Sequence, residues 1–241
     1  MNEDQYGIMD KLEQTNWWYL GRRKIVKKMF AKYMSTCKDV LDVGCGTGEG
    51  RNIVPKEVVL SGLDESPIAL EYAKEKGYNF LKQSSGDAIQ FTDNSFEGII
   101  MLDVLEHIED DSKTLSECLR VLRPNGKLIL TVPAYQWLWS GHDEVFGHKR
   151  RYTKKELVKK IKELEFEVIF SSYYFFTPLP AVVVFRVLER ILVNRKKSHF
   201  FKIPVFINKI LLFIISIESF LFEKGIVLPF GSSIIVVARK L

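Results

Sequence analysis

Residues 40–48 read Val-Leu-Asp-Val-Gly-Cys-Gly-Thr-Gly, an apolar strand that passes directly into a loop with glycine at every second position. Glycine tolerates unusual backbone dihedrals and lets the backbone approach a ligand closely. We expect a helix after this loop, because the free N–H groups of a helix start would face the same ligand. Asp64 ends the next apolar strand, at the spacing from which a second-strand carboxylate reaches ribose hydroxyls. This stretch therefore predicts an α/β fold with a nucleoside-type cofactor.

The spacing of the glycines separates two classes of cofactor. A dinucleotide site requires Gly-x-Gly-x-x-Gly, but a count from Gly44 places Glu49 at the third glycine position. Asp42, inside the first strand, also fits a nicotinamide fingerprint poorly. The string instead resembles motif I of the class I S-adenosylmethionine (SAM)-dependent methyltransferases.

Four further motifs extend this resemblance over residues 39–133. They resemble the ubiquinone/menaquinone-type branch of class I methyltransferases and read Gly86-Asp87-Ala88, Asp93-Asn94-Ser95-Phe96-Glu97, Asp103-Val104-Leu105-Glu106-His107 and Leu122-Arg123-Pro124-Asn125-Gly126. The resemblance implies SAM as cofactor: the glycine loop would hold its methionine part, Asp64 its ribose, and Asp87 with Ala88 its adenine edge. Asp103 and Val104 would lie under the sulfonium. The full set of candidate cofactor-binding residues is Asp42, Gly44, Cys45, Gly46, Gly48, Asp64, Glu65, Asp87, Ala88, Asp103 and Val104.

The flanks resemble a narrower prokaryotic group of methyltransferases, mostly of unassigned substrate and many linked to glycan or lipid-carrier pathways. The similar segments are residues 17–23, 139–153 and 229–231. The candidate substrate-binding residues there are Trp17, Trp18, Arg150, Arg151 and Tyr152. Alternatives remain open for both groups. The tryptophans belong either to a helix packed beside the sheet or to an aromatic lid over the cofactor or acceptor. The cations either bind substrate, lie in a solvated loop, or form salt bridges with Asp143 and Glu144.

Apolar segments alternate with amphipathic ones along the chain, which predicts a doubly wound, mostly parallel seven-stranded sheet of the Rossmann-like methyltransferase type. The expected strands cover residues 40–43, 58–63, 78–81, 96–103, 127–132, 166–170 and 232–238. Helix starts are expected at Ser66-Pro67 and at the capping box Thr153–Glu156, and a turn at residues 123–126. We expect an N-terminal helical cap over residues 1–36, with an amphipathic helix at 17–34. The core covers 37–172 and 231–241, and an apolar helical insertion covers 173–230.

Composition narrows the partners and the compartment. A net charge of +5 is mild for a nucleic-acid binder, and the acid that ends the fourth strand is not followed by the Pro-Pro-aromatic string of amino-methylating nucleic-acid enzymes. Cys37, Cys45 and Cys118 have neither paired nor metal-like spacing, and the polar N-terminus is unlike a secretory signal. We therefore expect a cytoplasmic protein with no nucleic-acid partner and no metal.

An O-methyltransferase needs a group that accepts the proton of the acceptor hydroxyl. The candidates are His142 and His148, in a polar segment after the fifth strand, and His107, just after the fourth. Each has a purely structural alternative, as a hydrogen-bonded residue.

The insertion before the last strand is unusually apolar. Residues 180–193 concentrate Arg186, Glu189 and Arg190 on one helical side, and the apolar stretch 203–222 is interrupted by Lys209 and Glu218. Neither resembles a spanning helix of about 20 uncharged residues. We expect residues 178–224 to dock on the inner face of the cell membrane, with Arg195, Lys196, Lys197 and Lys202 facing anionic headgroups.

The sequence thus predicts an O-methyltransferase for a hydrophobic or lipid-linked small-molecule or glycan acceptor. Two alternatives remain: a soluble small-molecule methyltransferase that forms a homodimer through its C-terminal helices, and a non-catalytic SAM-binding regulatory or assembly protein.

Overall fold

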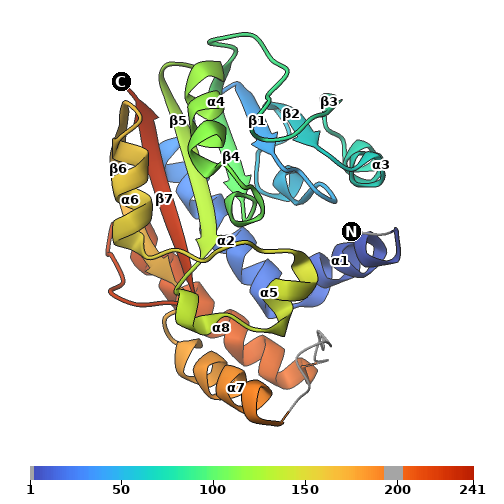
Figure 1. The fold of residues 1–241 in the computed structure, drawn as a ribbon, viewed down its shortest axis with the longest axis vertical. Coiled ribbons are helices and arrows are strands. Elements are labelled where there is room, and N and C mark those ends of the chain that lie inside the picture. Colours follow the sequence, from blue (N-terminus) through green and yellow to red (C-terminus); the bar gives the residue numbers. More distant parts are fainter. Residues whose placement is uncertain (1–2, 193–202) are drawn as a thin grey trace.

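One seven-stranded sheet organises the chain (Figure 1). The structure is a computed structural model that describes residues 3–192 and 203–241. The strands lie in the order β3 (Phe80–Gln83), β2 (Val59–Asp64), β1 (Asp39–Val43), β4 (Phe96–Leu102), β5 (Leu122–Pro133), β7 (Ser233–Lys240) and β6 (Phe166–Tyr174). The pairs from β3 to β5 are parallel, and β7 runs antiparallel to both β5 and β6. The predicted Rossmann-like methyltransferase fold is confirmed.

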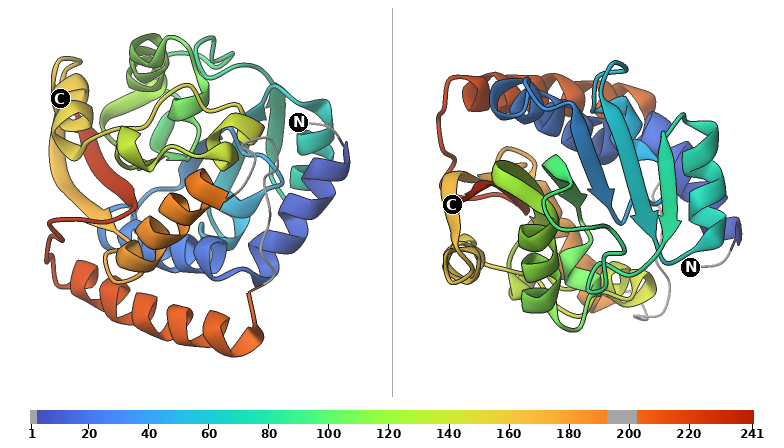
Figure 2. Two further views of the ribbon diagram at one scale, coloured as in Figure 1. Left: turned by 60° about the horizontal axis from the view of Figure 1, so that its bottom comes forward. Right: turned by 90° about the horizontal axis from the view of Figure 1, so that it is seen from above.

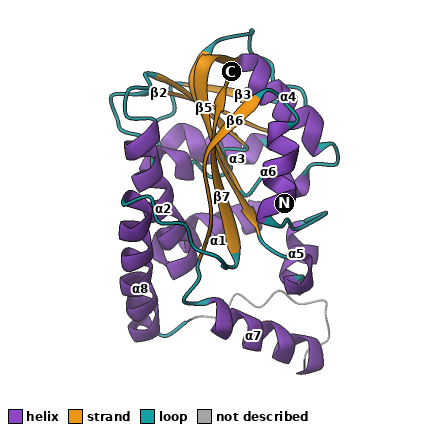
Figure 3. Ribbon diagram, turned by 90° about the vertical axis from the view of Figure 1, so that its left-hand side faces the viewer, coloured by secondary structure: helices purple, strands orange, loops and turns teal. Residues whose placement is uncertain are grey.

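Helices cover both faces of the sheet (Figure 3). On one face lie α2 (Trp17–Tyr33) and α8 (Val205–Glu223), and on the other lie α4 (Asp111–Val121) and α6 (Lys154–Lys162). Because side chains of a strand alternate between faces, β5 contributes to two cores. Ile129 packs on the side of α2, whereas Leu128 and Leu130 pack on the side of α4. The sheet is therefore buried on both sides, as a doubly wound fold requires.

Local signals in the sequence set several boundaries. Ser66 accepts a hydrogen bond from the Ala69 N–H and precedes Pro67, the first residue of α3 (Pro67–Glu75). Thr153 and Glu156 form a complete capping box at the start of α6. The two expected helix starts are confirmed. The expected turn at residues 123–126 is not a separate turn: residues 122–133 form the single strand β5, in which Asn125 has a positive φ of 64° and the register against β4 is irregular.

One expectation about helices was wrong, and two helices were not individually predicted. The glycine loop leads only into a short 3-10 turn, η1 (Glu49–Asn52), and not into a regular helix. Pro55 explains this, because proline lacks an N–H and disfavours helical dihedrals at the residue before it. At the N-terminus, α1 (Glu3–Thr15) precedes the expected helix, and α5 (Gly141–Phe146) forms where a polar segment was expected.

The insertion contains α7 (Leu179–Leu192) and α8, both predicted as apolar helices. One side of α8 packs on α2, where Ile215 lies so close to Gly21 that a Cβ there would be 2.8 Å from its Cδ1. Viewed from below, α7 and α8 lie at the same end of the molecule as α1 and α5 (Figure 2). The basic tract that includes Arg195, Lys196, Lys197 and Lys202 lies outside the described residues.

Candidate active site

The glycine loop follows β1 at the carboxyl end of the sheet. Gly44, Gly46 and Gly48 have φ values of 69°, 51° and 91°, a region that favours glycine. A Cβ at Gly44 would lie 2.5 Å from Cγ2 of Val104, which follows β4. The N–H groups of Gly44 and Cys45 donate to the Leu63 carbonyl, each at 2.9 Å. The loop is thus fixed between β2 and the segment after β4, where the predicted cofactor site lies.

Asp64 ends β2 beside this loop, as expected of a ribose ligand. Its Oδ2 accepts a hydrogen bond from the Gly46 N–H and its Oδ1 accepts one from the Ser66 N–H, both at 2.9 Å. Burial raises the pKa of this carboxyl above its usual value. Glu65 beside it is exposed. Asp64 therefore joins the glycine loop to the start of α3, and its lone pairs lie at the mouth of the predicted site.

Asp42 lies behind the glycine loop. It is 2% exposed and accepts a hydrogen bond of 2.5 Å from the Tyr78 hydroxyl. A Cβ at Gly50 would collide with its Oδ2. Burial is the main cause that raises the pKa of Asp42 to about 7. Its contacts indicate that Asp42 supports the loop from inside the protein.

The predicted adenine-binding pair lies on the loop between β3 and β4. Asp87 accepts a hydrogen bond from Ser85 and pairs with Lys113 at 3.6 Å. Ala88 is exposed. The Ser85 hydroxyl, aided by Lys113, lowers the pKa of Asp87, so this carboxylate is ionised and accessible.

The N-terminal helices cover the glycine loop. Glu13 of α1 is 1% exposed and accepts a hydrogen bond of 2.6 Å from Thr47. Arg23 of α2 binds both oxygens of Glu49 at 2.7 Å. An aromatic lid of Trp17 and Trp18 was one of the two alternatives; it is α1 that contacts the glycine loop, through Thr47.

The two tryptophans are the first residues of α2, and their rings contact Phe175 and Arg22. Trp17 is buried against Phe175, with ring centroids 5.3 Å apart, which favours the packing alternative. Trp18 lies 5.1 Å from the Arg22 guanidinium. Arg22 in turn pairs with Asp103 at 2.5 Å, and Asp103 has a positive φ of 56°. Arg22 was not among the predicted site residues, although it lies within the Trp17–Arg23 motif.

The three candidate proton acceptors converge. The rings of His107 and His148 are 4.7 Å apart and perpendicular, and His142 lies 6.1 Å from His148. Nδ1 of His148 is 2.8 Å from Oδ1 of the buried Asp143. Burial lowers the pKa of His107 to about 4 and that of His142 to about 3. Both imidazoles are therefore neutral at pH 7 and have a nitrogen that can accept a proton.

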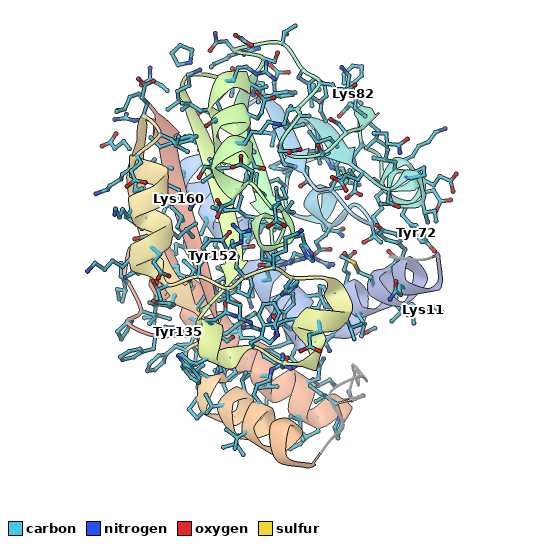
Figure 4. All side chains as sticks on the ribbon, viewed as in Figure 1. Lys11, Tyr72, Lys82, Tyr135, Tyr152 and Lys160 are labelled. Carbon is cyan, nitrogen blue, oxygen red and sulfur yellow. The ribbon has the colours of Figure 1, made fainter. Side chains whose placement is uncertain are left out.

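The predicted cationic substrate residues form ion pairs. Arg151 donates from Nε and Nη2 to Asp143 at 2.8 and 3.0 Å, and from Nη1 to the Ala134 carbonyl. Arg150 pairs with Asp111 at 3.3 Å. The buried Tyr152 donates to Asp111 at 2.9 Å, and Lys160 reaches the same carboxylate (Figure 4). These contacts favour the salt-bridge alternative, with Asp111 as a partner where Glu144 was expected.

The groups around the loop fit SAM chemically. Asp64 is a suitable acceptor for a diol, and the exposed Ala88 leaves room for a base edge. Asp103, the expected neighbour of the sulfonium, is already paired with Arg22. Residues 41–130 match the sequence family described as a methyltransferase domain.

Similarity to known proteins supports the same class of protein, the methyltransferases. The chain is 28% identical over 162 residues to a probable SAM-dependent methyltransferase of Mycolicibacterium smegmatis. The aligned region covers 65% of this chain and 62% of that protein. It is 29% identical over 142 residues to the ubiquinone biosynthesis O-methyltransferase of Rickettsia felis, covering 54% of each. Both matches span less than two thirds of the relative's length. A SAM-dependent methyltransferase structure from Archaeoglobus fulgidus shares the fold, with a TM-score of 0.57 and 17% identity over 90% of this chain and 94% of that chain.

The fold and the site define a SAM-binding α/β domain. The chain carries a class I SAM-dependent methyltransferase domain, and SAM is its cofactor.

Proposed function

We propose that the protein is an O-methyltransferase that acts on a hydrophobic or lipid-linked acceptor. The observation that carries this proposal is the convergence of His107, His142 and His148 near the end of β4. Their neighbour Val104 touches the glycine loop, so the histidines lie on the side from which an acceptor would approach. The similarity to an O-methyltransferase of ubiquinone biosynthesis in Rickettsia felis also supports an oxygen acceptor.

The residues of the chain have distinct parts in this reaction. SAM supplies an activated methyl group when it is bound. The glycine loop and Asp64 hold the cofactor, and α1 shields it from water through Glu13 and Thr47. Asp143 holds His148 through Nδ1, which leaves Nε2 directed away from that carboxylate. A neutral imidazole at this position can accept the hydroxyl proton as the oxygen attacks the methyl carbon in line.

Product formation tests the proposal. The protein is incubated with methyl-labelled SAM and a lipid extract, and label is measured in the organic phase. Separate His107→Gln, His142→Gln and His148→Gln variants are each expected to lower turnover about 10²–10⁴-fold if the substituted group takes the proton. SAM affinity, measured by calorimetry, should stay within a fewfold of wild type. Tight SAM binding without any labelled product would instead favour a non-catalytic SAM-binding protein.

We further propose that α8 docks on an anionic membrane surface. One side of the helix exposes an apolar stripe that repeats every three or four residues, Phe206, Ile210, Phe213, Ile217 and Phe220. Phe206 and Phe213 are 73% and 70% exposed. By length and composition the helix could cross a membrane, and 22% of its apolar 18-residue stretch is buried in the protein. A contiguous apolar stripe of this kind is typical of an interaction surface.

The opposite side of α8 is bound to the domain, which favours a helix that lies along the membrane. Glu218 is 3% exposed and accepts hydrogen bonds from the backbone N–H groups of Phe175 and Thr177 at 2.8 and 2.9 Å. Asn208 accepts one from the Trp17 N–H at 2.7 Å. A spanning orientation would break these contacts.

Charge favours a lipid surface over a second copy of the chain. Lys24, Lys28 and Lys32 of α2 all contact α8, through Ser216, Glu223 and the carbonyls at its end. In a symmetric dimer through α8, these cations of both copies would gather near the interface. Near an anionic surface each basic residue contributes about 1 kcal/mol of attraction. This attraction supports the proposal that α8 docks at the inner face of the cell membrane.

Flotation with lipid vesicles distinguishes membrane docking of α8 from dimerisation through α8. Wild type is expected to float with phosphatidylglycerol vesicles at low salt, and a Phe206→Ser/Phe213→Ser/Phe220→Ser variant is expected to stay in solution. Phe80→Ser is the matched control, because Phe80 is 63% exposed on β3. A wild-type chain that does not float and is dimeric by light scattering, with the dimer lost in the triple variant, would support the homodimer alternative and overturn membrane docking.

A further inference from the structure

Two of the histidines near the end of β4 form a cluster with a buried carboxylate. One ligand atom each from Glu106, His107 and His148 lies within 4.8 Å of the other two. Glu106 and His107 follow β4 within η2 (Leu105–His107), and His148 follows α5. In Figure 1 the segment after α5 crosses the lower end of β5 on its way to α6. The fold thereby joins residues that are far apart in the sequence.

Glu106 is the unusual member of the cluster. It is fully buried, and neither of its carboxylate oxygens has a hydrogen-bond partner among residues 3–192 and 203–241. The two neighbouring carboxylates are compensated, since Asp103 pairs with Arg22 and Asp143 pairs with Arg151. A buried carboxylate without a partner is strongly destabilising unless a cation or a proton compensates it.

One of the two histidines is held as metal ligands usually are. Asp143 Oδ1 lies 2.8 Å from Nδ1 of His148, and the His107 ring lies edge-on to the His148 ring, with ring centroids 4.7 Å apart. Ligating histidines characteristically use one ring nitrogen for such a partner and the other for the ion. The Lys149 N–H donates to the Glu106 carbonyl at 2.8 Å, which fixes the His148 segment against η2.

We propose that Glu106, His107 and His148 bind a first-row divalent cation such as Zn²⁺, Mn²⁺ or Co²⁺. Two imidazoles and one carboxylate suit these ions better than Mg²⁺ or Ca²⁺, which prefer oxygen ligands. Metal–ligand distances of about 2.1 Å place the ligand atoms of a tetrahedral site about 3.4 Å apart. The three atoms now lie within 4.8 Å of one another, so metal binding would draw them closer by up to about 1.4 Å. Sequence spacing alone led us to expect no metal, because His148 is remote from the Glu106-His107 pair.

This inference rests on the proposed O-methyltransferase function for its catalytic role. Three protein ligands leave coordination positions open for the acceptor oxygen. Coordination lowers the pKa of a hydroxyl, which loses its proton to solvent. The oxygen then forms the bond to the methyl carbon, and the electron pair of the broken carbon–sulfur bond stays on sulfur. The cation would thus activate the acceptor, and His107 and His148 would then be its ligands instead of proton acceptors.

Metal binding is measured on the full chain after treatment with a chelator. Titration with Co²⁺, followed by visible absorption and by calorimetry with Zn²⁺, is expected to show one site per chain. Glu106→Gln, His107→Gln and His148→Gln should each weaken it by at least about 10²-fold, beyond the 10–100-fold typical of outer-shell changes. His142→Gln is the matched control: it removes a histidine beside the cluster, and the one-to-one site should remain.

Thermal unfolding provides a second readout. Zn²⁺ should raise the Tm of wild type and leave that of Glu106→Gln unchanged. Without metal, Glu106→Gln should have the higher Tm of the two, because it removes an uncompensated buried carboxylate.

Two results would overturn the metal site: no stoichiometric binding in wild type, or binding that persists in all three ligand variants. SAM affinity and labelled product are measured separately. If metal binds but labelled product also forms without it, the catalytic role of the cation is wrong; if metal binds and no product forms, the proposed O-methyltransferase function fails.

Discussion

Val104 lies directly against Gly44, so that a Cβ added to this glycine would be 2.5 Å from one methyl group of Val104 and 2.8 Å from the other. The same glycine has a φ of 69°. We expect Gly44→Ala to combine backbone strain of about 1–2 kcal/mol with overpacking of about 1–3 kcal/mol. SAM affinity measured by calorimetry should fall at least tenfold, since the loop backbone must move.

Gly77→Ala is the matched control for strain. Gly77 has a φ of 89°, and a Cβ there would have nothing within 4 Å. This variant should lose stability in chemical denaturation but retain SAM affinity. In the Gly44→Ala/Val104→Ala double variant most of the overpacking should be relieved, since only the Cβ of residue 104 stays close, at 3.2 Å. A double variant as unstable as the single one would contradict the contact.

Asp64 connects the loop to the cofactor site, and its charge is testable separately from its shape. Asp64→Asn keeps an oxygen for one of the two backbone N–H donors, Gly46 and Ser66, but loses the charge that binds a diol strongly. We expect SAM affinity to fall about ten- to a hundredfold, corresponding to about 1.5–3 kcal/mol. Asp39→Asn, at a surface ion pair with Arg123, should leave SAM affinity unchanged. Equal affinities of Asp64→Asn and wild type would reject the ribose assignment.

The stability of the protein should depend on pH through Asp42. Its folded-state pKa of about 7 lies above the unfolded value of about 3.9, so the folded state binds the extra proton between these values. Stability contributed by this group therefore decreases as pH rises from about 4 to about 7, by a total of about 4 kcal/mol. Asp42→Asn should lack this decrease and can still accept the Tyr78 hydrogen bond. The difference between the two unfolding free energies, measured by urea denaturation across this range, checks the prediction; parallel curves would contradict it.

Several elements of the fold were predictable because their causes are local. Apolar runs such as residues 58–63 and caps such as Ser66 act over a few neighbouring residues, and the structure follows them. The helix α1 was missed because its attachment is tertiary: Glu13 pairs with Thr47 and Lys76, which no local pattern reveals. Pro55 could have predicted that no regular helix forms after the glycine loop.

The site was predictable only in part, for the same reason. Gly44 and Asp64 belong to a motif with fixed spacing, so their positions followed from the sequence. The partners of Arg151 and of Glu106 depend on how the segment after α5 folds across the end of the sheet. The sequence offered one signal that was not used, since the acidic residue beside His107 had no assigned partner.

The attachment of α8 depends on one buried carboxylate. Glu218 accepts backbone N–H groups of Phe175, Phe176 and Thr177, at 2.8, 3.3 and 2.9 Å. Hydrogen bonds to a charged group contribute about 1.5–3 kcal/mol each, and their loss leaves buried donors unsatisfied. We expect Glu218→Ala to destabilise the protein by about 3–5 kcal/mol in urea denaturation and to speed amide exchange at residues 175–177.

Glu223→Ala is the matched control on the same helix. Glu223 pairs with Lys28 at 2.7 Å, with both side chains more than 40% exposed. Exposed ion pairs contribute about 0–1 kcal/mol, so this variant should unfold close to wild type and keep its exchange rates. Equal losses of stability in Glu218→Ala and Glu223→Ala would show that the carboxylate of Glu218 does not hold α8 on the domain. The argument that α8 lies along a membrane without spanning it would then lose its main support.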